Sequence, residues 1–418
     1  VYSAKLIVQY RHCKSEVELL AKFVEWWGKN CPDVITGWNV RLFDIPYLVN
    51  RIRRIGSEEA VKRLSPWGLV SQRELHIKGK RMDAYEITGV QQLDYYDLFQ
   101  KFGYSYGAQE SYKLDHIAYV VLGERKLSIE EHGNLYTLYK EDHQKFIDYN
   151  IRDVELIERL EEKMGLITLA ITMAYRGGVN YADTFGTTAI WDSIIYRELN
   201  ATGTIVPPNK HKMKSPYPGG YVKEPMVGSH DWVVSFDLNS LYPNLIVQYN
   251  MSPETILPNK SFPHGVDYYL NKSCDTEGVS VAANGSAFTK EFQGIVPKII
   301  ENYYSERSVI KKSMLIAQQA YEKTKTIELE REINQLENRQ MAIKILLNSL
   351  YGALGNQYFR YFDMRVAEGI TLSGQLSIRW AEIAMNKEMN KLLGTVDKDY
   401  VIAIDTDSLY VNFSPLVS

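Results

Sequence analysis

The chain has 418 residues and a formal net charge of −3, with 45% hydrophobic and 24% charged residues. This length exceeds one ordinary hydrophobic core, so we expect two or more domains. The charge excludes an overall basic field, and a polyanionic partner would have to bind in a local groove. Cys13, Cys31 and Cys274 follow no ligand or disulfide spacing, which indicates a reducing compartment and no zinc site.

The sequence contains no apolar stretch of membrane-spanning length and does not open with a signal peptide. We therefore expect a cytoplasmic protein without a membrane partner. The chain begins at Val1, just before an expected strand at 5–10, and stops soon after expected strands at 400–413. Both ends look cut, so we expect a fragment of a longer polypeptide.

The first third of the chain mixes helical and strand patterns. The expected elements are a helix at 16–27, a strand at 33–38, a helix ending at Arg51, a hairpin at 73–89 around Gly79, and a strand-like segment at 93–98 that leads into a helix. Asp44 occupies the expected N-cap of the helix ending at Arg51, and Pro46 its first turn.

The clearest helix of this region covers 143–164. Tyr149 and Asp153 are four residues apart on one face of it. A hydroxyl one turn from a carboxylate can position a water molecule beside a metal ion that the carboxylate binds. Each residue alone has a simpler interpretation, with Asp44 as a helix cap and Asp153 as a solvated side chain beside Arg152.

We interpret residues 165–204, in the middle of the chain, as connecting structure. Helical stretches are expected at 166–175 and 188–199, and a basic loop with Lys210, His211, Lys212 and Lys214 precedes Tyr217-Pro-Gly-Gly-Tyr221. Gly219 and Gly220 would let the backbone approach a partner closely, and the lysines could meet phosphates. A solvated interdomain turn explains these residues equally well.

A short strand at 232–236 is rich in β-branched and aromatic residues, and we expect it to be buried in a core. Asp237 stands where this strand ends, and Pro243 suits the first turn of the helix that follows. A carboxylate at the end of a rigid strand is well placed to hold a metal ion. We therefore interpret Asp237 as a candidate metal ligand.

The region 297–352 has the longest helical pattern, and its break near 323–326 predicts an antiparallel pair of helices. Arg307 and Lys311 share one helix face, as do Lys344, Asn348 and Tyr351. A solvated face is the ordinary interpretation of such charges. Lys344, however, lies in an otherwise apolar helix end, where its charge needs a partner such as a triphosphate.

The last expected elements are two strands around a tight turn that contains Asp405, Thr406 and Asp407. These carboxylates could reflect turn chemistry alone. If they bind metal with Asp237, the strand at 232–237 must lie beside this hairpin. We then expect an antiparallel sheet with helices behind it.

Several of these segments together resemble the motifs of family B DNA polymerases. The matching segments are Asn39-x-x-x-Phe43-Asp44 and Tyr149-Asn-x-x-Asp153, Tyr217-Pro-Gly219-Gly220, Asp237-Leu-Asn-Ser-Leu-Tyr-Pro243, Lys344-x-x-x-Asn348-Ser-x-Tyr351-Gly352, and Asp405-Thr406-Asp407-Ser. They occur in the family's order, and the overall similarity is greatest to the T-even bacteriophage type, although the helical hairpin looks shorter. Motif matches remain hypotheses until their structural context is seen.

For the first third, the resemblance implies a 3′–5′ exonuclease. Asp44 and Asp153 would bind metal, Tyr149 would position water, and Asn39 and Phe43 would contact the single-stranded 3′ end. The family's first motif, Asp-x-Glu, is absent, so it is expected upstream of Val1. This nuclease site is therefore expected to be weak or inactive.

For the polymerase site, the resemblance implies that Asp237 and Asp407 ligate two Mg²⁺ ions, with Mn²⁺ as an alternative, and that the Leu238 carbonyl assists. The backbone of Ser240, Leu241 and Tyr242 would contact the phosphates, and Tyr242 would exclude a 2′ hydroxyl. The remaining implied roles are phosphate binding by Arg307, Lys311 and Lys344, a base pocket at Asn348 and Tyr351, template contacts at Tyr217, Gly219 and Gly220, and support from Asp405, Thr406 and Gly352.

The implied fold is a multidomain α/β and α+β protein. Its expected parts are a ribonuclease H-like exonuclease domain at 1–165, a connecting segment at 166–208, an antiparallel-sheet palm at 209–293 and 357–418, and helical-hairpin fingers at 294–356. The implied function is DNA-directed DNA synthesis from dNTPs on primer–template DNA, in host cytoplasm if the protein is viral. A sliding clamp would bind through a C-terminal segment that, like the thumb, is missing here.

Two other classes of function remain to be compared. A reverse transcriptase is disfavoured by the upstream nuclease motifs and by the Asn-Ser-x-Tyr-Gly helix. A catalytically incomplete DNA-binding fragment stays open, because the thumb and part of the palm are missing.

Overall fold

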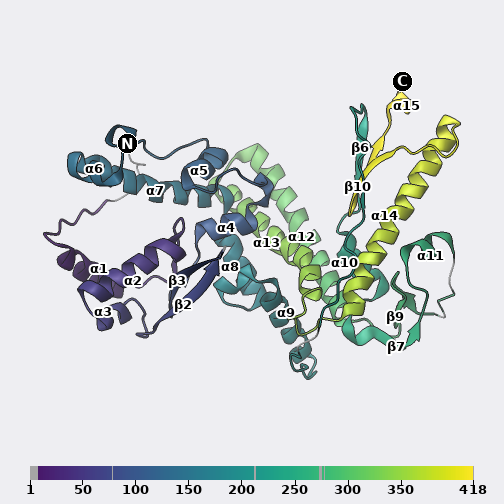
Figure 1. The fold of residues 1–418 in the computed structure, drawn as a ribbon, viewed down its shortest axis with the longest axis horizontal. Helices are drawn as coiled ribbons and strands as arrows, with labels where there is room; N and C mark the ends of the chain where they lie inside the picture. Colours follow the sequence, from purple (N-terminus) through teal and green to yellow (C-terminus); the bar gives the residue numbers. More distant parts are fainter. Residues whose placement is uncertain (1–7, 78, 211–212, 273–274, 277, 418) are drawn as a thin grey trace. The chain divides into compact units, whose positions relative to one another are not determined.

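The computed structural model describes residues 8–77, 79–210, 213–272, 275–276 and 278–417. The chain forms two compact units, Val1–Ile171 and Thr172–Ser418, whose elements are labelled in Figure 1. The expected strand at 5–10 falls largely outside the described residues, and 8–10 belong to no strand. His211, Lys212 and Cys274 also lie outside them. No helix among the described segments is long and apolar enough to cross a membrane.

The first unit is mainly helical, with two small sheets. Its elements are α1 (Glu16–Asn30), β1 (Val34–Ile35), a π-helical turn (Val40–Asp44), α2 (Ile45–Ile55), α3 (Glu58–Lys62), β2 (Val70–Ile77), β3 (Lys80–Ile87), β4 (Gln91–Gln92), α4 (Tyr95–Phe102), α5 (Leu114–Leu122), α6 (Leu135–Glu141) and α7 (His143–Met164). α8 (Leu166–Gly177) contains the boundary between the units.

The core of this unit forms where α1 and α2 pack against the β2–β3 hairpin. Val24 and Trp27 of α1 are buried together with Val49 and Ile52 of α2 and Ile87 of β3. β2 and β3 pair antiparallel from Val70↔Ile87 to Ile77↔Lys80, and β1 pairs parallel with β4. The expected hairpin and the helices at 16–27 and 143–164 are therefore confirmed, whereas the strand expected at 33–38 is reduced to β1.

The strand-like segment expected at 93–98 is wrong. Residues 91–92 form β4, and α4 begins at Tyr95 because the Asp94 side chain accepts a hydrogen bond from the Tyr96 N–H. A carboxylate in this position satisfies a helix amide that has no partner within the helix. The buried aromatic residues of the segment therefore lie on a helix face.

The second unit contains the remaining helices and strands. They are α9 (Thr187–Ala201), β5 (Val222–Lys223), β6 (Val233–Asp237), α10 (Leu241–Tyr249), β7 (Ile256–Ser261), α11 (Val266–Asn271), β8 (Ser280–Val281), β9 (Ser286–Phe288), α12 (Ile295–Thr324), α13 (Ile327–Leu354), α14 (Met364–Leu393), β10 (Val401–Asp405), β11 (Ser408–Asn412) and α15 (Ser414–Val417). The expected helices of the connecting segment are confirmed as α8 and α9.

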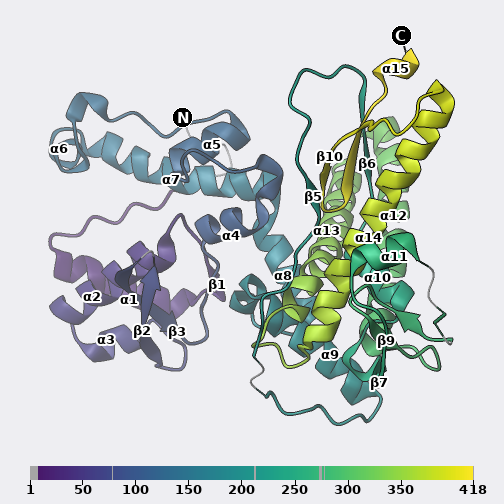
Figure 2. The ribbon, with the colours of Figure 1, turned by 45° about the vertical axis from the view of Figure 1, so that its right-hand side comes forward.

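An antiparallel sheet of order β5-β10-β11-β6 organises this unit. β10 and β11 pair across the turn at 406–407, and β6 pairs with β11 so that Asp237 stands opposite Ser408. Ile378 and Met389 of α14 are buried against the sheet, and Figure 2 shows α14 running beside β10. The expected antiparallel sheet with a helix behind it is confirmed.

The expectation that the strand at 232–236 is buried is wrong. Val233, Val234 and Phe236 are 40%, 41% and 42% exposed, and Trp232 is 65% exposed. β6 is an edge strand of the sheet among the described residues. Strand propensity measures how well a side chain fits a pleated surface, and it does not separate an edge strand from a central one.

The antiparallel helix pair expected at 297–352 is confirmed by α12 and α13, which lie side by side in Figures 1 and 2. The break falls at Lys325, which has a left-handed backbone (φ 47°), and at Thr326, which caps α13. A left-handed residue after the last helical turn is a common way to end a helix.

Candidate functional site

Two carboxylates meet at the ends of β6 and β10–β11. The pairing of Asp237 with Ser408 is reinforced by the Ser408 hydroxyl, which donates to Asp237 Oδ2 at 3.1 Å. The Leu238 N–H donates to the carbonyl oxygen of Asp407 at 2.8 Å. The sheet thereby brings Asp237 and Asp407 to one cavity of about 450 Å³, although 169 residues of sequence separate them.

The turns that hold these carboxylates have unusual backbone conformations. Thr406, between Asp405 and Asp407, has φ 56°, and Ser240 has φ 53°. Residues other than glycine rarely adopt this left-handed backbone conformation, and they keep it only where the surrounding structure enforces it. For Thr406, the N–H donates to the Tyr221 carbonyl at 2.8 Å. The backbone therefore fixes both turns at the cavity.

The electrostatics of the pair fit a divalent cation. The pKa of Asp407 is raised by burial and then by the charge of Asp237, with a smaller contribution from Asp405. Neighbouring carboxylates that repel each other are stabilised when a cation binds between them. Among the described residues, no group of three or more His, Cys, Asp or Glu side chains is arranged so that it could hold a metal ion. The protein therefore offers few carboxylates here, and backbone oxygens or a bound ligand would complete the coordination.

The opposite wall of the cavity is basic and comes from α12 and α13. Its lining includes Arg307, Lys311, Lys344, Asn348 and Tyr351. No carboxylate lies within ion-pair distance of these three cations among the residues that the structure describes. A space between paired carboxylates and unpaired cations can hold a phosphorylated ligand together with its metal.

Residues 240–242 form the floor between these walls. Ser240, Leu241 and Tyr242 line the cavity at the start of α10. The ring of Tyr242 packs on that of Tyr351 with 4.8 Å between centroids, and burial raises the pKa of the Tyr242 hydroxyl, with Asp407 adding to the effect. Against the other side of the Tyr242 ring lies Gly374, where a Cβ would come within 2.9 Å of Cε1. The ring is thus held between two helices.

The remaining expected residues lie around the cavity without lining it. Asp405 is exposed and accepts from the Thr406 hydroxyl at 3.0 Å, and Tyr217 shares a hydroxyl–hydroxyl hydrogen bond of 3.2 Å with Tyr351. Gly352 lines a neighbouring cavity with Lys214. The Leu238 side chain packs against the core behind the sheet.

A contributing residue that the sequence did not reveal is Gln340. It is 5% exposed, and its Oε1 accepts from Arg307 Nε at 3.2 Å while its Nε2 donates to Glu337 at 3.0 Å. This chain of hydrogen bonds orients the Arg307 side chain. The sequence feature that could have identified Gln340 is its position four residues before Lys344, on the same helix face.

Gly220 approaches the turn at Thr406 too closely for any side chain. A Cβ on Gly220 would lie 2.6 Å from Thr406 Oγ1, whereas a Cβ on Gly219 would meet nothing within 4 Å. We expect Gly220→Ala to lower the free energy of unfolding by about 1–3 kcal/mol, because the overpacked turn must shift. Gly219→Ala, the matched control, should change it by less than about 0.5 kcal/mol. Urea denaturation of both variants measures the difference, and equal losses would contradict the close approach.

The expected nuclease residues meet in a second cleft, of about 680 Å³, in the first unit. Asn39, Asp44, Tyr149 and Asp153 line it, whereas Phe43 does not and is 64% exposed. The structure thus brings together residues from the turn at 40–44 and from α7, as the expected shared site requires.

Asp44 occupies the expected N-cap position of α2 and Pro46 lies in its first turn, but the Asp44 side chain does not cap the helix. Its backbone is already helical and its side chain makes no capping hydrogen bond, because the π-helical turn runs directly into α2. The Asp94 carboxylate holds this turn instead, accepting from the N–H groups of Asn39 and Arg41 at 2.9 and 3.0 Å. Burial raises the pKa of Asp44, which lines the cleft, and a backbone hydrogen bond within the residue offsets part of this effect.

Lys126 is a second residue that the sequence did not reveal. Its Nζ donates to Asp153 Oδ2 at 2.7 Å and to the Tyr149 hydroxyl at 3.1 Å. Burial raises the pKa of Asp153, and the charge of Asp115 adds to the shift, although Lys126 opposes it. The other Asp153 oxygen, Oδ1, is buried without a hydrogen-bond partner. An acceptor left open in this way fits a metal ligand. Lys126 lies in an irregular segment, so no periodicity pointed to it.

Replacing Lys126 with methionine should destabilise the first unit in a pH-dependent way. We expect a loss of about 1–2 kcal/mol at neutral pH, because Asp153 keeps its charge in a half-buried place without a counterion. The pKa of Asp153 would rise further, and a carboxyl with a raised pKa makes the fold less stable as pH increases. The deficit should therefore shrink as pH falls through that raised pKa.

Urea denaturation over a pH series measures this effect, with Lys101→Met as the control. Lys101 is an exposed lysine of α4 in the same unit. A Lys126→Met deficit that stays constant with pH would contradict an electrostatic role for the lysine.

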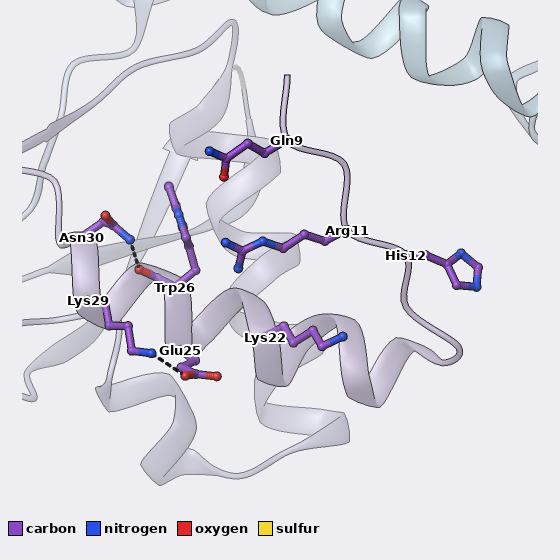
Figure 3. A pocket seen from close by; sticks show the side chains of 8 residues that line it. All are labelled: Gln9, Arg11, His12, Lys22, Glu25, Trp26, Lys29 and Asn30. Carbon is purple, nitrogen blue, oxygen red and sulfur yellow. Dashed lines mark hydrogen bonds and ion pairs between the residues drawn. The ribbon is translucent and has the colours of Figure 1, made fainter. Parts of the chain in front are cut away.

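A third cavity, shown in Figure 3, contains no expected site residue. Arg11, Trp26 and Lys29 are among its lining side chains, beside the start of the described chain. Lys29 pairs with Glu25 at 2.6 Å, and Lys22 pairs with Glu18 at 2.7 Å. Both lysines of this cavity are therefore already paired within α1.

Comparisons with known proteins find similarity over almost the whole chain. The model of the family "DNA polymerase family B" matches residues 186–416, and the model "DNA polymerase family B, exonuclease domain" matches residues 2–117. The chain is 33% identical to a "DNA-directed DNA polymerase" of Escherichia phage RB69, over 98% of this chain and 49% of that protein.

Two further relatives come from another phage and from a mammal. A "DNA-directed DNA polymerase" of Enterobacteria phage T4 is 33% identical over 97% of this chain and 49% of its own length. The "DNA polymerase delta catalytic subunit" of Bos taurus is 28% identical over 91% of this chain and 34% of its own length. The chain thus spans about half the length of the phage relatives.

Proposed function

Because the chain belongs to DNA polymerase family B, we propose that it is the part of a DNA-directed DNA polymerase that adds deoxynucleotides to a primer 3′ end. One observation carries the proposal. A single cavity of about 450 Å³ combines Asp237 and Asp407 with the cations Arg307, Lys311 and Lys344. Nucleotidyl transfer needs metal ligands on one side of a triphosphate and positive charges on the other.

In this proposal Asp237 and Asp407 hold two Mg²⁺ ions, with Mn²⁺ as an alternative, and the Leu238 carbonyl assists. When bound, the ions activate the primer hydroxyl and neutralise charge on the leaving pyrophosphate. The protein contributes mainly by orienting its own groups. Gln340 holds Arg307 toward the phosphates, and the left-handed turn at Ser240 presents backbone groups to them.

The base and sugar of the incoming dNTP would lie along α13 and α10. Asn348 and Tyr351 line the base pocket, and the Tyr242 ring lies where a 2′ hydroxyl would otherwise fit. Tyr217, Gly219 and Gly220 contact the template strand, while Asp405, Thr406 and Gly352 support the turns. The hydrogen bond from Tyr217 to Tyr351 supports a continuous wall between template and nucleotide.

The cleft of the first unit is proposed as a 3′–5′ exonuclease site in a ribonuclease H-like domain. Asp44 and Asp153 would hold metal, with Tyr149 positioning water. Asn39 and Phe43 would contact the unpaired 3′ end. The exonuclease-domain model that matches residues 2–117 supports this assignment, as does the open acceptor of Asp153.

The domain division also remains our proposal: exonuclease at 1–165, connector at 166–208, palm at 209–293 and 357–418, fingers at 294–356. The proposed partners are primer–template DNA and dNTPs, with a sliding clamp as a partner of the longer protein. The phage relatives support a host-cell cytoplasm as the location.

Primer extension by the purified chain tests the proposal. We expect a labelled primer to lengthen with four dNTPs and Mg²⁺, and EDTA to stop the reaction. Fluorescence anisotropy of the same primer–template measures binding independently. Because the chain spans about half of its phage relatives, the second candidate is a DNA-binding portion without catalysis. Binding without extension would favour that candidate.

A further inference from the structure

A buried tryptophan of α9 contacts both helices of the fingers hairpin. Trp191 is fully buried, and its Nε1–H donates to the Ser349 hydroxyl on α13 at 3.1 Å. The Ser349 hydroxyl in turn donates to the Leu346 carbonyl at 2.8 Å. The indole and the serine therefore satisfy each other, and a buried donor left without its acceptor would be costly.

The same indole packs against α12. The rings of Trp191 and Tyr303 lie with centroids 6.1 Å apart. Tyr303 is one helical turn before Arg307, and Ser349 directly follows Asn348. One side chain thus contacts both helices of the basic wall, next to a phosphate-binding residue on α12 and next to a base-pocket residue on α13.

Neighbouring ion pairs hold α9 and the hairpin in place. Asp192 accepts two hydrogen bonds from Arg360, at 2.7 and 3.2 Å, and Arg360 also donates to the Pro207 carbonyl at 2.9 Å. Arg176 pairs with Glu306, which directly precedes Arg307. The first pair thus holds α9, which carries the indole, against the segment after α13, and the second joins α8 to α12. A side chain on a helix that is held in this way can keep the helices that it contacts at a constant separation.

We propose that Trp191 is a positioning residue that sets the spacing of α12 and α13 in the basic wall of the nucleotide cavity, and thereby the selectivity of the cavity for a correctly paired nucleotide. This inference rests on the proposed polymerase function. A pocket rejects a mispaired base only if its walls do not yield, and small displacements of positioned groups reduce reaction rates strongly. Trp191 touches no substrate, so its effect would pass through Ser349 and Tyr303.

The test compares Trp191→Phe with Trp27→Phe. Trp27 is a matched control, because it is also buried and its Nε1–H donates to the Leu64 carbonyl at 2.8 Å, within the first unit. Each variant removes one buried indole hydrogen bond. Single-nucleotide incorporation gives kcat and KM for matched and mismatched dNTPs, and hydrogen exchange reports the backbone of residues 345–352 in the protein alone.

For Trp191→Phe we expect a loss of roughly 10-fold in kcat/KM for the matched dNTP, with the larger part in KM. The loss of kcat/KM for a mismatched dNTP should be smaller, so the ratio of kcat/KM between matched and mismatched dNTPs decreases. Amides 345–352 should exchange roughly 10-fold faster than in the wild type. Trp27→Phe should change none of these quantities beyond about 2-fold.

A double-mutant cycle with Ser349→Ala locates the effect. If Trp191 acts through this hydroxyl, the loss in Trp191→Phe/Ser349→Ala will be clearly smaller than the combined losses of the single variants. Fully additive losses would overturn the proposal. So would a Trp191→Phe variant that matches Trp27→Phe in discrimination or in exchange of residues 345–352. A wild-type chain that extends no primer would overturn the proposed function, while exchange would still decide whether Trp191 positions α13.

Discussion

Replacing Asp407 with alanine is expected to reduce primer extension by at least about 1,000-fold, because the proposed metal site loses one of its two carboxylates. Primer–template affinity should stay within about 3-fold, since exposed phosphate contacts dominate such binding. The reason is geometric. Asp407 lies beside Asp237 on the same side of the cavity, and the pKa of Asp407 is raised by burial and by that neighbouring charge. Among the residues that the structure describes, no other carboxylate lines this cavity.

Single-turnover extension and anisotropy separate the two quantities. Asp405→Ala is the matched control, because Asp405 lies two residues away on the same turn, is exposed and does not line the cavity. Its loss in extension should stay below about 10-fold, as expected for a supporting group. If Asp407→Ala extended primers normally, or if Asp405→Ala lost as much activity, the metal assignment would fail.

Replacing Tyr242 with alanine is expected to weaken the rejection of ribonucleotides by roughly 100-fold or more, with a smaller effect on dNTPs. The Tyr242 ring has little room to move. Its centroid lies 4.8 Å from that of Tyr351, and Gly374 is so close that a Cβ there would collide with the ring. A fixed ring beside the sugar excludes a 2′ hydroxyl by contact. Alanine would leave space for that hydroxyl.

The measurement is the ratio of kcat/KM for dCTP and CTP opposite a template guanine. Tyr242→Phe is the control, because it keeps the ring and removes only the hydroxyl. It should discriminate within about 3-fold of the wild type, since contact with the ring and not a hydrogen bond excludes the sugar. Undiminished rejection of CTP by Tyr242→Ala would place the sugar elsewhere.

Local patterns in the sequence predicted the long elements and the helix face shared by several residues of the cavity that holds Asp237 and Asp407. The positions of Lys344, Asn348 and Tyr351 on one helix face follow from helical periodicity, and all three line the cavity. The placement of Asp237 at a strand end and of Asp407 in a tight turn required only short-range patterns. The resemblance to a family then indicated that these segments belong to one site.

The failures of prediction have a common cause. β6 was expected to be buried because its residues favour strands, but burial depends on which strands and helices pack against it. The segment at 93–98 looked like a strand, yet the Asp94 side chain begins a helix there and also holds the turn at 39–41. In both cases contacts with residues distant in sequence contribute: the elements that pack beside β6, and Asn39 and Arg41, whose N–H groups donate to the same Asp94 carboxylate that binds the local Tyr96 N–H.

The sequence alone therefore determined the helix and strand content of the motif segments and the residue types that line the cavity. Hydrogen bonds within a few residues and the repeat of a helix or strand encode these features locally. Only the tertiary structure decided that Lys126 pairs with Asp153, that Gln340 orients Arg307, and that Trp191 joins α12 and α13. Each of these contacts forms when separate elements pack together, and no local spacing specifies them.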